Sequence, residues 1–271
     1  GDMYVVRPVH NSYPNTQVGV QRMHTTITVY KVVKGYIELQ KASTCTNVSD
    51  NNKLYSLAGA EFSIYDASGK FVQKLTTNEK GETGRSGLLT AGTYTVKETK
   101  APEGYYAADD FTVTVNAGQV TKKTVGDKPY NDPLRMVVGK FDGQKTYNGA
   151  GNLPQGSATL ADAEFTVDYY DTFDYDNYDA LKKADIEPTR SWTFKTNANG
   201  IAHFTADDFV SGDVFYYNTN NDPCIPRGTI VVRETKAPTG YLKSNAISFQ
   251  KIMEGSNVDA LRTYNLAEVP E

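Results

Sequence analysis

Short runs of alternating apolar and polar residues recur along the chain, and turn-forming residues separate them. The run FTVTV at 111–115 alternates strictly, while 68–70, 78–82 and 116–119 carry the Gly, Asn and Ser residues typical of turns. Helical patterns are brief, at 179–184 and 206–209, and too short for the helices that connect the strands of a parallel α/β sheet. The pattern predicts an all-β chain of small antiparallel sandwiches, with 116–119 closing a hairpin.

Two sequence motifs occur twice in the same order. LAGAEFSIYD at 57–66 returns as LADAEFTVDYYD at 160–171, and ETKAPEGYY at 98–106 returns as ETKAPTGYL at 234–242. The motifs lie 36 positions apart in the first copy (98 − 62) and 69 apart in the second (234 − 165), so the second copy carries 33 additional residues (69 − 36). Internal repetition on this scale predicts two tandem domains of one fold.

Turn residues place the domain limits. The stretch DKPYNDP at 127–133 holds two Pro and an Asn-Asp pair, which stop a regular element. We therefore predict a first domain at 25–131 and a second at 132–271, with residues 1–24 unassigned. The additional residues are expected around 169–190 and around Cys224. The acidic, Tyr-rich stretch at 169–179 is interpreted as a solvated loop, because Asp179 stands where a calcium loop of EF-hand type needs Gly.

Strand periodicity places a carboxylate on the apolar side of one strand in each copy. Residues i, i+2 and i+4 of a strand share a face, so Glu98 shares its face with Tyr94 and Val96. Glu234 shares its face with two apolar residues in the same way. Both glutamates are therefore predicted to point into a core.

The same periodicity turns a lysine inward at the start of each copy and an amide or carboxyl group inward at the end. Lys41 follows Ile37 and Leu39 at intervals of two, and Lys140 follows apolar residues in the same way. Asp127 aligns with Val125, and Asn265 aligns with Leu261 and Thr263. Each predicted core thus contains a lysine, a glutamate and an acceptor side chain.

Charges in an apolar interior are costly unless they pair, become neutral or react. Burial favours a neutral amine and a protonated carboxylic acid, and such an acid can polarise a side-chain carbonyl and transfer a proton while the amine attacks. Groups held in contact gain a high effective concentration. An amide bond between two side chains is therefore the predicted product, with water leaving from Asp or ammonia leaving from Asn.

These motifs resemble those of the collagen-adhesin B-type (CnaB, or SpaA-like) domains of Gram-positive surface proteins and pilins. The resemblance rests on a lysine, L-x-[GD]-A-E-F, E-T-K-A-P-x-G-Y and a terminal Asp or Asn, and it covers both copies. It implies tandem transthyretin-like or immunoglobulin-like β-sandwich domains, each tied by a self-formed isopeptide bond with a glutamate as catalyst. Carried over by position, the two implied sets are Lys41, Glu98 and Asp127, and Lys140, Glu234 and Asn265.

Several alternatives remain open at the level of sequence. Asn131 lies four residues after Asp127 and competes with it as acceptor, and Lys31 and Lys34 are substitutes for Lys41. A buried salt bridge without covalent chemistry, or a lysine that extends its ammonium group to water, is the simpler interpretation of each set.

Composition excludes other classes of function. Lys and Arg total 28 against 32 Asp and Glu without a basic block, so nucleic acid is not an expected partner. The three His and two Cys are too scattered to suggest a metal site, and no cofactor is expected. Cys45 and Cys224 fall in different copies, so we expect no disulfide between them. Apolar runs fall short of a membrane span, which requires about 18 residues.

The sequence thus predicts a stalk or adhesin segment and not an enzyme that turns over. GDMYVV at the N-terminus lacks the features of a signal peptide, so the chain is either cytoplasmic or a piece of a secreted protein. The resemblance favours an extracellular, cell-wall-associated fragment without membrane contact. Expected partners are neighbouring domains of the same surface protein. The alternative function is a module that binds a glycan or a host matrix protein through the insertion at 169–190.

Overall fold

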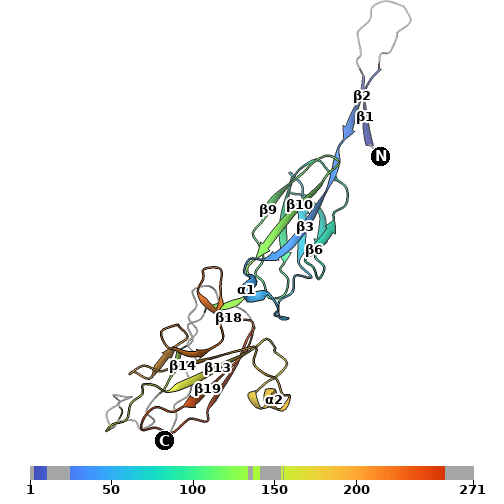
Figure 1. Cartoon of the computed structure of the whole chain (residues 1–271). Coiled ribbons are helices and arrows are strands. Elements are labelled where there is room, and N and C mark those ends of the chain that lie inside the picture. The colour runs from blue at the N-terminus through green and yellow to red at the C-terminus, as the bar shows by residue number, and fades with distance from the viewer. Residues whose placement is uncertain (1–2, 11–24, 134–136, 141–153, 155, 254–271) are drawn as a thin grey trace, which may run out of the picture. The chain divides into compact units, whose positions relative to one another are not determined.

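The structure is a computed structural model that describes residues 3–10, 25–133, 137–140, 154 and 156–253 (Figure 1). Strands dominate it, and only two short helices occur in the described part of the chain, which confirms the all-β prediction. In the N-terminal half the elements are β1 (Met3–His10), β2 (Thr25–Val32), β3 (Lys34–Ser43), α1 (Thr46–Ser49), β4 (Glu61–Tyr65), β5 (Phe71–Thr76), β6 (Glu82–Arg85), β7 (Leu89–Thr90), β8 (Gly92–Lys100), β9 (Phe111–Val115) and β10 (Val120–Asp127). In the C-terminal half they are β11 (Asn131–Pro133), β12 (Val137–Gly139), β13 (Glu164–Tyr170), α2 (Tyr178–Lys183), β14 (Arg190–Lys195), β15 (Ile201–His203), β16 (Phe209–Gly212), β17 (Tyr216–Tyr217), β18 (Pro223–Pro226), β19 (Gly228–Lys236) and β20 (Ile247–Ile252).

The first two strands form a separate antiparallel hairpin. Met3 pairs with Val32 at one end of β1, and His10 pairs with Thr25 at the other. The sequence left 1–24 unassigned and placed 25–32 in the first domain, whereas the structure pairs these two segments with each other. The uninterrupted run of β-branched residues TTITV at the start of β2 favours its extended conformation.

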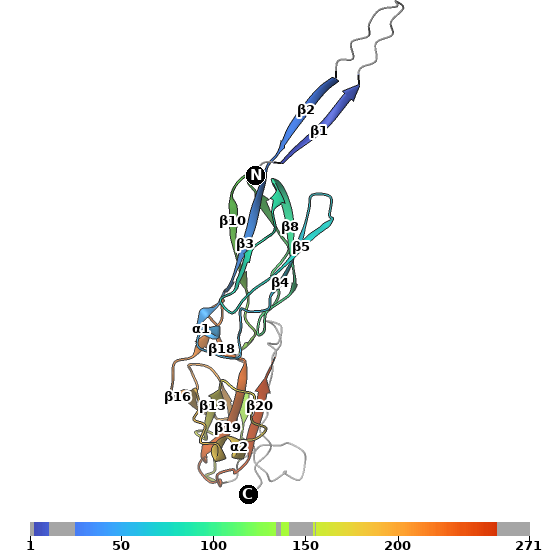
Figure 2. The same cartoon turned by 90° about the vertical axis from the view of Figure 1, so that its right-hand side faces the viewer.

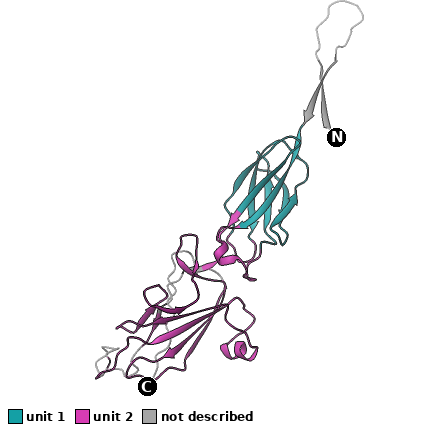
Figure 3. Cartoon of the chain, in the orientation of Figure 1, with its two compact units in different colours: residues 1–42, 57–101, 107–125 teal, residues 43–56, 102–106, 126–271 magenta. Residues whose placement is uncertain are grey.

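The chain divides into two compact units, and each unit is composed of several segments that alternate along the sequence (Figure 3). Unit 1 comprises 1–42, 57–101 and 107–125, and unit 2 comprises 43–56, 102–106 and 126–271. The domain limits predicted from sequence, 25–131 and 132–271, run along the chain and remain predictions.

Unit 1 is centred on two sheets that face each other across an apolar core (Figure 2). One sheet has the order β10-β3-β6 with β7 also paired to β3, and the other has the order β5-β4-β8-β9. Alternation along the strands supplies the core, because every second residue of β3 is buried. The buried core residues are Ile37, Leu39, Ala60, Phe62, Ile64, Leu75, Leu89, Tyr94, Val96, Val113, Val115 and Val125.

The neighbouring strands β3 and β10 run parallel, which corrects the prediction of a purely antiparallel sandwich. Tyr36 N donates to Gln119 O over 2.8 Å, and Thr44 N donates to Asp127 O over 2.9 Å. The sequence separation is the same at both ends (119 − 36 = 83 and 127 − 44 = 83), whereas it would change along an antiparallel pair. The first and last strands of the first repeat are therefore adjacent and aligned in the same direction.

The turn at 116–119 does not close a hairpin, contrary to the sequence prediction. β9 pairs with β8 in one sheet, and β10 pairs with β3 in the other. The turn thus carries the chain between sheets. Local turn chemistry was correctly recognised, but it does not specify which strand becomes the hydrogen-bonding neighbour.

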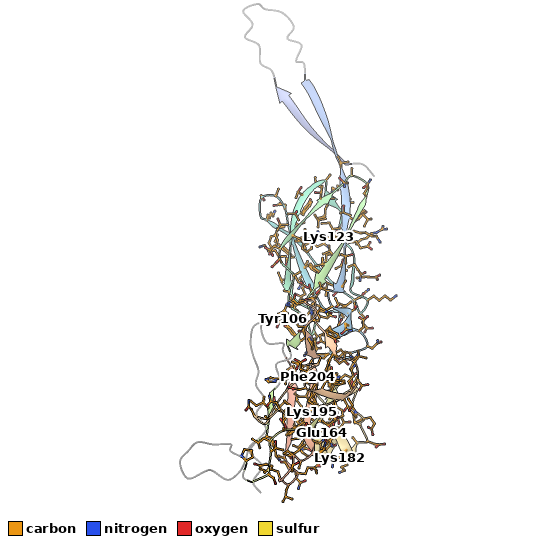
Figure 4. All side chains as sticks on the ribbon, turned by 60° about the vertical axis from the view of Figure 1, so that its left-hand side comes forward. Tyr106, Lys123, Glu164, Lys182, Lys195 and Phe204 are labelled. Carbon is orange, nitrogen blue, oxygen red and sulfur yellow. The ribbon has the colours of Figure 1, made fainter. Side chains whose placement is uncertain are left out.

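Unit 2 is built around a five-stranded sheet of order β16-β14-β13-β19-β20. Smaller sheets, β11-β18-β17 and β12-β15, accompany it. At the start of β13, Glu164 pairs in register with Lys195 of β14 (Figure 4) and forms an ion pair of 2.7 Å with Lys236 of β19. The main aromatic cluster of the unit consists of Trp192, Phe194, Phe204, Phe209, Phe215 and Tyr216.

The insertion at 169–190 folds over the sheet and does not form a simple solvated loop. It contains α2, whose N-cap Asn177 accepts a hydrogen bond from Ala180 N over 2.8 Å. Leu181 of α2 is fully buried in a cluster with residues of β13 and β19, and Tyr175 and Tyr178 pack against this cluster. The aromatic residues of the insertion thus have a packing role that its acidic composition concealed. The second brief helix predicted, at 206–209, is instead a turn that leads into β16.

Both cysteines are buried within unit 2, and neither forms a disulfide. Cys45 Sγ donates to Tyr217 O over 3.2 Å, and Cys224 is the register partner of Tyr216. The absence of a disulfide was predicted because the two cysteines fall in different copies of the repeat. That reason is wrong, because the segment 43–56, which contains Cys45, belongs to unit 2 together with Cys224.

Candidate functional site

A buried lysine and a buried glutamate meet in unit 1. Lys41 Nζ lies 3.0 Å from Glu98 Oε1 and 3.1 Å from Glu98 Oε2, and both side chains are 0% exposed. The ammonium group lies 5.3 Å from the ring centroid of Phe62, whose electron-rich face favours a cation. The face prediction for Lys41 and Glu98 is thus confirmed in its geometry: two inward residues on different sheets meet in the core.

Unit 2 contains an equivalent pair. Lys140 Nζ lies 2.9 Å from Glu234 Oε1, and the two side chains are 1% and 0% exposed. Lys140 Nζ also donates to Leu242 O over 3.3 Å and lies 6.0 Å from the ring centroid of Tyr241. The second repeat therefore rebuilds the buried ion pair of the first despite its longer sequence.

Each glutamate also accepts a backbone hydrogen bond from the loop that follows its motif. Ala108 N donates to Glu98 Oε2 over 2.7 Å, and Ser244 N donates to Glu234 Oε2 over 2.5 Å. The donor lies ten residues after the glutamate in both repeats (108 − 98 and 244 − 234). These donors were not predicted from the sequence, because a backbone N–H group leaves no residue signature. Their equal spacing after E-T-K-A-P-x-G-Y is the signal that could have indicated them.

The strands hold the two glutamates at matching positions. Glu98 on β8 pairs with Phe62 on β4, and Glu234 on β19 pairs with Phe165 on β13. In both repeats the register shifts between this phenylalanine and the residue before it. Such an irregularity can redirect a side chain at the end of a strand.

A turn with one indispensable glycine follows each glutamate. Gly104 has φ +89° and Gly240 has φ +87°, conformations that L-residues with side chains rarely adopt. A Cβ at Gly104 would lie 2.6 Å from the ring of Tyr55, and one at Gly240 would lie 2.6 Å from the Cβ of Ala158. The glycine of E-T-K-A-P-x-G-Y is therefore required for both backbone conformation and close packing.

The predicted acceptors differ in what the structure describes. Asp127 is 1% exposed at the end of β10. Asn131 lies in β11, which pairs with β18, and its Nδ2 donates to Pro129 O over 3.2 Å. Asn265, the acceptor predicted for the second domain, lies outside the described residues.

The substitutes considered for Lys41 occupy other positions. Lys34 begins β3, at the opposite end of the strand from Lys41, and pairs with Thr90. Lys31 lies in β2 and pairs with Tyr4 of the hairpin. Lys41 is thus the lysine that the structure brings to Glu98.

Two polar pockets border the insertion of unit 2. One, of about 450 Å³, is lined by Thr46, Asn47, Asp50, Asn51, Asn52, Asp171, Thr189, Arg190 and Tyr216. The other, of about 340 Å³, is lined by Asp168, Tyr170, Tyr178, Lys182, Asp185, Ile186, Glu187, Pro188 and Arg233. In the second pocket Arg233 Nη2 donates to Asp168 Oδ2 over 2.6 Å, and burial raises the pKa of the Tyr170 phenol.

Within the part of the chain that the structure describes, no group of three or more His, Cys, Asp or Glu side chains is arranged to hold a metal ion. Neither of the helices described is long and apolar enough to cross a membrane.

Comparison with known proteins identifies the family. The family described as "SpaA: Prealbumin-like fold domain" matches residues 35–129 and 154–261, which together form most of the chain. The chain belongs to this SpaA family. Its tandem β-sandwich domains and the resemblance inferred from the repeated motifs are thereby confirmed.

Known relatives of this SpaA-family chain include the trypsin-resistant surface T6 protein of Streptococcus pyogenes serotype M6. It is 39% identical over 69 residues, which are 25% of this chain and 13% of the T6 protein. The chain thus spans only a small part of that relative.

Two solved structures are also similar. The Bacillus anthracis TIE protein has a TM-score of 0.55 at 19% identity, over 99% of this chain and 41% of that protein. A C-terminal fragment of the pilus adhesin SpaC from Lactobacillus rhamnosus GG has a TM-score of 0.43 at 16% identity, over 87% of this chain and 96% of that fragment. At these identities the likeness to the TIE protein shows a shared fold.

Proposed function

We propose that this chain is a load-bearing segment of a Gram-positive, cell-wall-associated surface protein, and that each domain forms an intramolecular isopeptide bond. The observation that carries the proposal is the recurrence of a fully buried Lys–Glu pair at matching positions of both repeats. A buried ion pair is poor at adding stability, since apolar residues of similar volume often do as well or better. Two such pairs are better explained by a reaction that needs both groups.

In the first domain the proposed acceptor is Asp127, joined to Lys41. Its side chain is buried, and its strand β10 is the parallel neighbour of β3, which carries the lysine. Asn131 is the weaker candidate, because its strand pairs with β18 and its amide binds Pro129 O. In the second domain the proposed bond joins Lys140 to Asn265.

The reaction is a condensation without a change in oxidation state. The ammonium group of the lysine first transfers a proton to its paired glutamate, and the resulting neutral amine attacks the side-chain carbonyl carbon of Asp127 or Asn265, forming a C–N bond. The glutamate accepts a proton from the attacking amine and delivers a proton to the leaving group. A C–O bond to Asp127 breaks and water leaves, or a C–N bond to Asn265 breaks and ammonia leaves. Each site reacts once, so the chain is not an enzyme with turnover.

Such a bond would suit a stalk under tension. Force entering at the start of β3 would pass along that strand to Lys41, cross to Asp127 and leave at the end of β10. The 85 residues between the bonded pair (127 − 41 − 1) would carry no load. The bond would also oppose proteolysis, because partial opening could not separate the first and last strands.

The intact mass of the denatured protein tests this proposal. Two bonds remove about 35 Da from the sequence mass, about 18 Da as water and about 17 Da as ammonia. The variants Glu98→Ala and Glu234→Ala should each restore one of these increments. An unmodified wild-type mass would refute the covalent proposal and leave two buried ion pairs.

A second candidate function is binding of a glycan or a host matrix protein through unit 2. Its support is the pair of polar pockets that border the insertion, with Tyr178 and Tyr216 among their lining residues. Aromatic faces beside carboxylate, amide and guanidinium groups suit a hydroxyl-rich saccharide. The neighbouring domains of the same surface protein remain the other proposed partners.

Binding screens on glycan and matrix-protein arrays distinguish the two functions. Wild-type protein is compared with Asp171→Ala in one pocket and Lys182→Ala in the other, because both side chains line a pocket without belonging to a lysine–glutamate site. Binding that is lost in either variant supports the module. Absence of binding by wild-type protein supports the stalk alone.

A further inference from the structure

A third motif, T-N-x-x-G, also occurs in both repeats, and the function proposed above does not use it. It reads TNEKG at 77–81 and TNANG at 196–200, directly after β5 and β14. Part of the first copy was recognised in the sequence only as a turn. The structure shows that the two copies make the same set of contacts.

The threonine of the motif fastens the loop that precedes the central strand. In unit 1, Thr77 Oγ1 donates to Leu57 O over 2.7 Å and accepts from Ala60 N over 2.9 Å. In unit 2, Thr196 Oγ1 donates to Leu160 O over 2.6 Å and accepts from Ala163 N over 3.0 Å. Both threonines are buried, at 5% and 2% exposure. The hydroxyl thus fixes the L-x-x-A-E-F loop that begins β4 and β13.

The asparagine shapes the turn that ends the motif. Asn78 Oδ1 accepts from Lys80 N and Glu82 N over 2.9 and 3.0 Å, and Asn197 Oδ1 accepts from the backbone N–H groups of the equivalent residues, Asn199 and Ile201, over 2.9 and 3.2 Å. An Asx turn of this kind delivers the following glycine into a left-handed conformation.

The glycine of the motif holds the backbone of the reactive lysine. Lys41 N donates to Gly81 O over 2.8 Å, and Lys140 N donates to Gly200 O over 2.7 Å. Their φ angles are +76° and +75°. A Cβ at Gly81 would lie 2.9 Å from Lys41 O, and one at Gly200 would lie 2.2 Å from Lys140 O. No side chain fits between this turn and the lysine strand.

From these contacts we infer that T-N-x-x-G is the positioning element of the crosslink, with Thr77 and Thr196 as positioning residues. The inference rests on the proposed isopeptide function and adds residues to it. A lysine amine stands at the end of a flexible four-carbon chain, so its approach depends on where the backbone is held. The motif ties that backbone to the loop before β4 or β13, the strands whose Phe62 and Phe165 pair with the glutamates. The motif thereby fixes the position of the lysine backbone relative to the glutamate before the amine attacks.

The experiment follows bond formation in the second domain over time. The full chain is made in a cell-free reaction, and intact mass is read at intervals under denaturing conditions. Loss of about 17 Da reports the second domain and loss of about 18 Da reports the first, which serves as an internal standard. The variant Thr196→Val removes the hydroxyl and keeps the shape, and Thr196→Ser restores the hydroxyl.

A matched control separates positioning from general destabilisation. Thr229 is 1% exposed, and its Oγ1 donates to Thr172 O over 2.7 Å, away from the T-N-x-x-G turn. Thr229→Val therefore removes a buried hydrogen bond of the same kind. Melting temperatures of Thr196→Val and Thr229→Val in a Glu234→Gln background give the cost to the fold without any crosslink in the second domain.

We expect Thr196→Val to slow the second mass loss by about 10- to 100-fold, since small displacements of reacting groups have effects of that size. Thr196→Ser and Thr229→Val should stay within about 2-fold of wild type, and the first domain should react normally in all variants. An unchanged rate in Thr196→Val, or equal slowing in Thr196→Val and Thr229→Val, overturns the positioning role while the crosslink stands. Absence of any mass loss in the wild type refutes the crosslink and the positioning role together.

Discussion

Replacement of Glu98 by Gln tests the crosslink through its effect on stability. The amide keeps the shape of the side chain and an oxygen that can accept from Ala108 N, but it removes the carboxylate beside Lys41. The reaction then lacks its proton-transfer group, and the buried lysine loses its ion pair with Glu98. Two separate losses of stability should follow.

The size of each loss can be estimated from the structure. A bond between Lys41 and Asp127 closes a loop of 86 residues (127 − 41), which in the chain-entropy description of crosslinks stabilises the fold by about 4.6 kcal/mol. Removal of one partner from a buried ion pair costs about 3–5 kcal/mol more. The total is comparable to the whole stability of an ordinary domain, about 5–15 kcal/mol.

The double variant Lys41→Met/Glu98→Gln separates the two contributions, because it removes the crosslink and both charges of the Lys41–Glu98 pair together. Calorimetry should show a fall in the melting temperature of the first domain by about 20–35 °C in the double variant, at about 4–8 °C per kcal/mol. The melting temperature of Glu98→Gln alone should fall further, and the intact mass of both variants should regain about 18 Da.

Three results would contradict this reasoning. Retention of the mass deficit in Glu98→Gln would show that the carboxylate is not needed for the bond. Restored mass with a melting temperature near that of the wild type would show that closing the loop adds little stability. Equal melting temperatures for the two variants would show that loss of the Glu98 carboxylate from beside Lys41 costs nothing.

Three further predictions concern unit 2. Gly200→Ala places a side chain in a left-handed conformation and against Lys140 O, so it should destabilise the unit by about 1–3 kcal/mol in urea unfolding and abolish the loss of about 17 Da. Arg233→Leu leaves Asp168, 3% exposed, without its guanidinium partner, and should lower the free energy of unfolding by about 3 kcal/mol in the same assay. Adding Asp168→Asn to this variant should restore part of the lost stability, because it removes the buried charge. Because burial raises the pKa of the Cys45 thiol, the thiolate that reacts forms only at higher pH, so iodoacetamide should label Cys45 slowly at pH 8 in folded protein and rapidly in urea; equal rates would contradict its burial.

Much of the candidate site could be predicted from single strands. Alternation alone placed Lys41, Glu98 and Glu234 on buried faces, because a strand turns every second side chain to the same side. Repetition then indicated that both copies use the same residues. These features are local, so they are visible without knowledge of the neighbouring strands.

Contacts between distant segments were not predictable in the same way. The donors Ala108 N and Ser244 N belong to loops, and the parallel pairing of β3 with β10 depends on which sheet receives the last strand. The turn at 116–119 has the chemistry of a hairpin, yet it connects two sheets. Short-range signals specify that the chain turns, but they do not determine which strand pairs with the strand that follows the turn.

The insertion at 169–190 also shows the difference between what local sequence predicts and what distant contacts decide. Its acidic and aromatic composition predicted a solvated loop, whereas Tyr175 and Tyr178 pack on a cluster that includes Leu181 of α2. The burial of an aromatic residue depends on whether a surface lies opposite to it, and that surface comes from β13 and β19.

The sequence by itself determined the all-β class, the tandem repeat, the inward lysines and glutamates and the family, because each depends on periodicity or on motifs within a few residues. Only the tertiary structure decided which lysine contacts Glu98, which backbone groups donate hydrogen bonds to the glutamates, and how T-N-x-x-G hydrogen-bonds to the backbone of the lysines. Those outcomes require strands far apart in sequence to become neighbours, and the free energy that selects such neighbours resides in the packed core as a whole and not in any one segment.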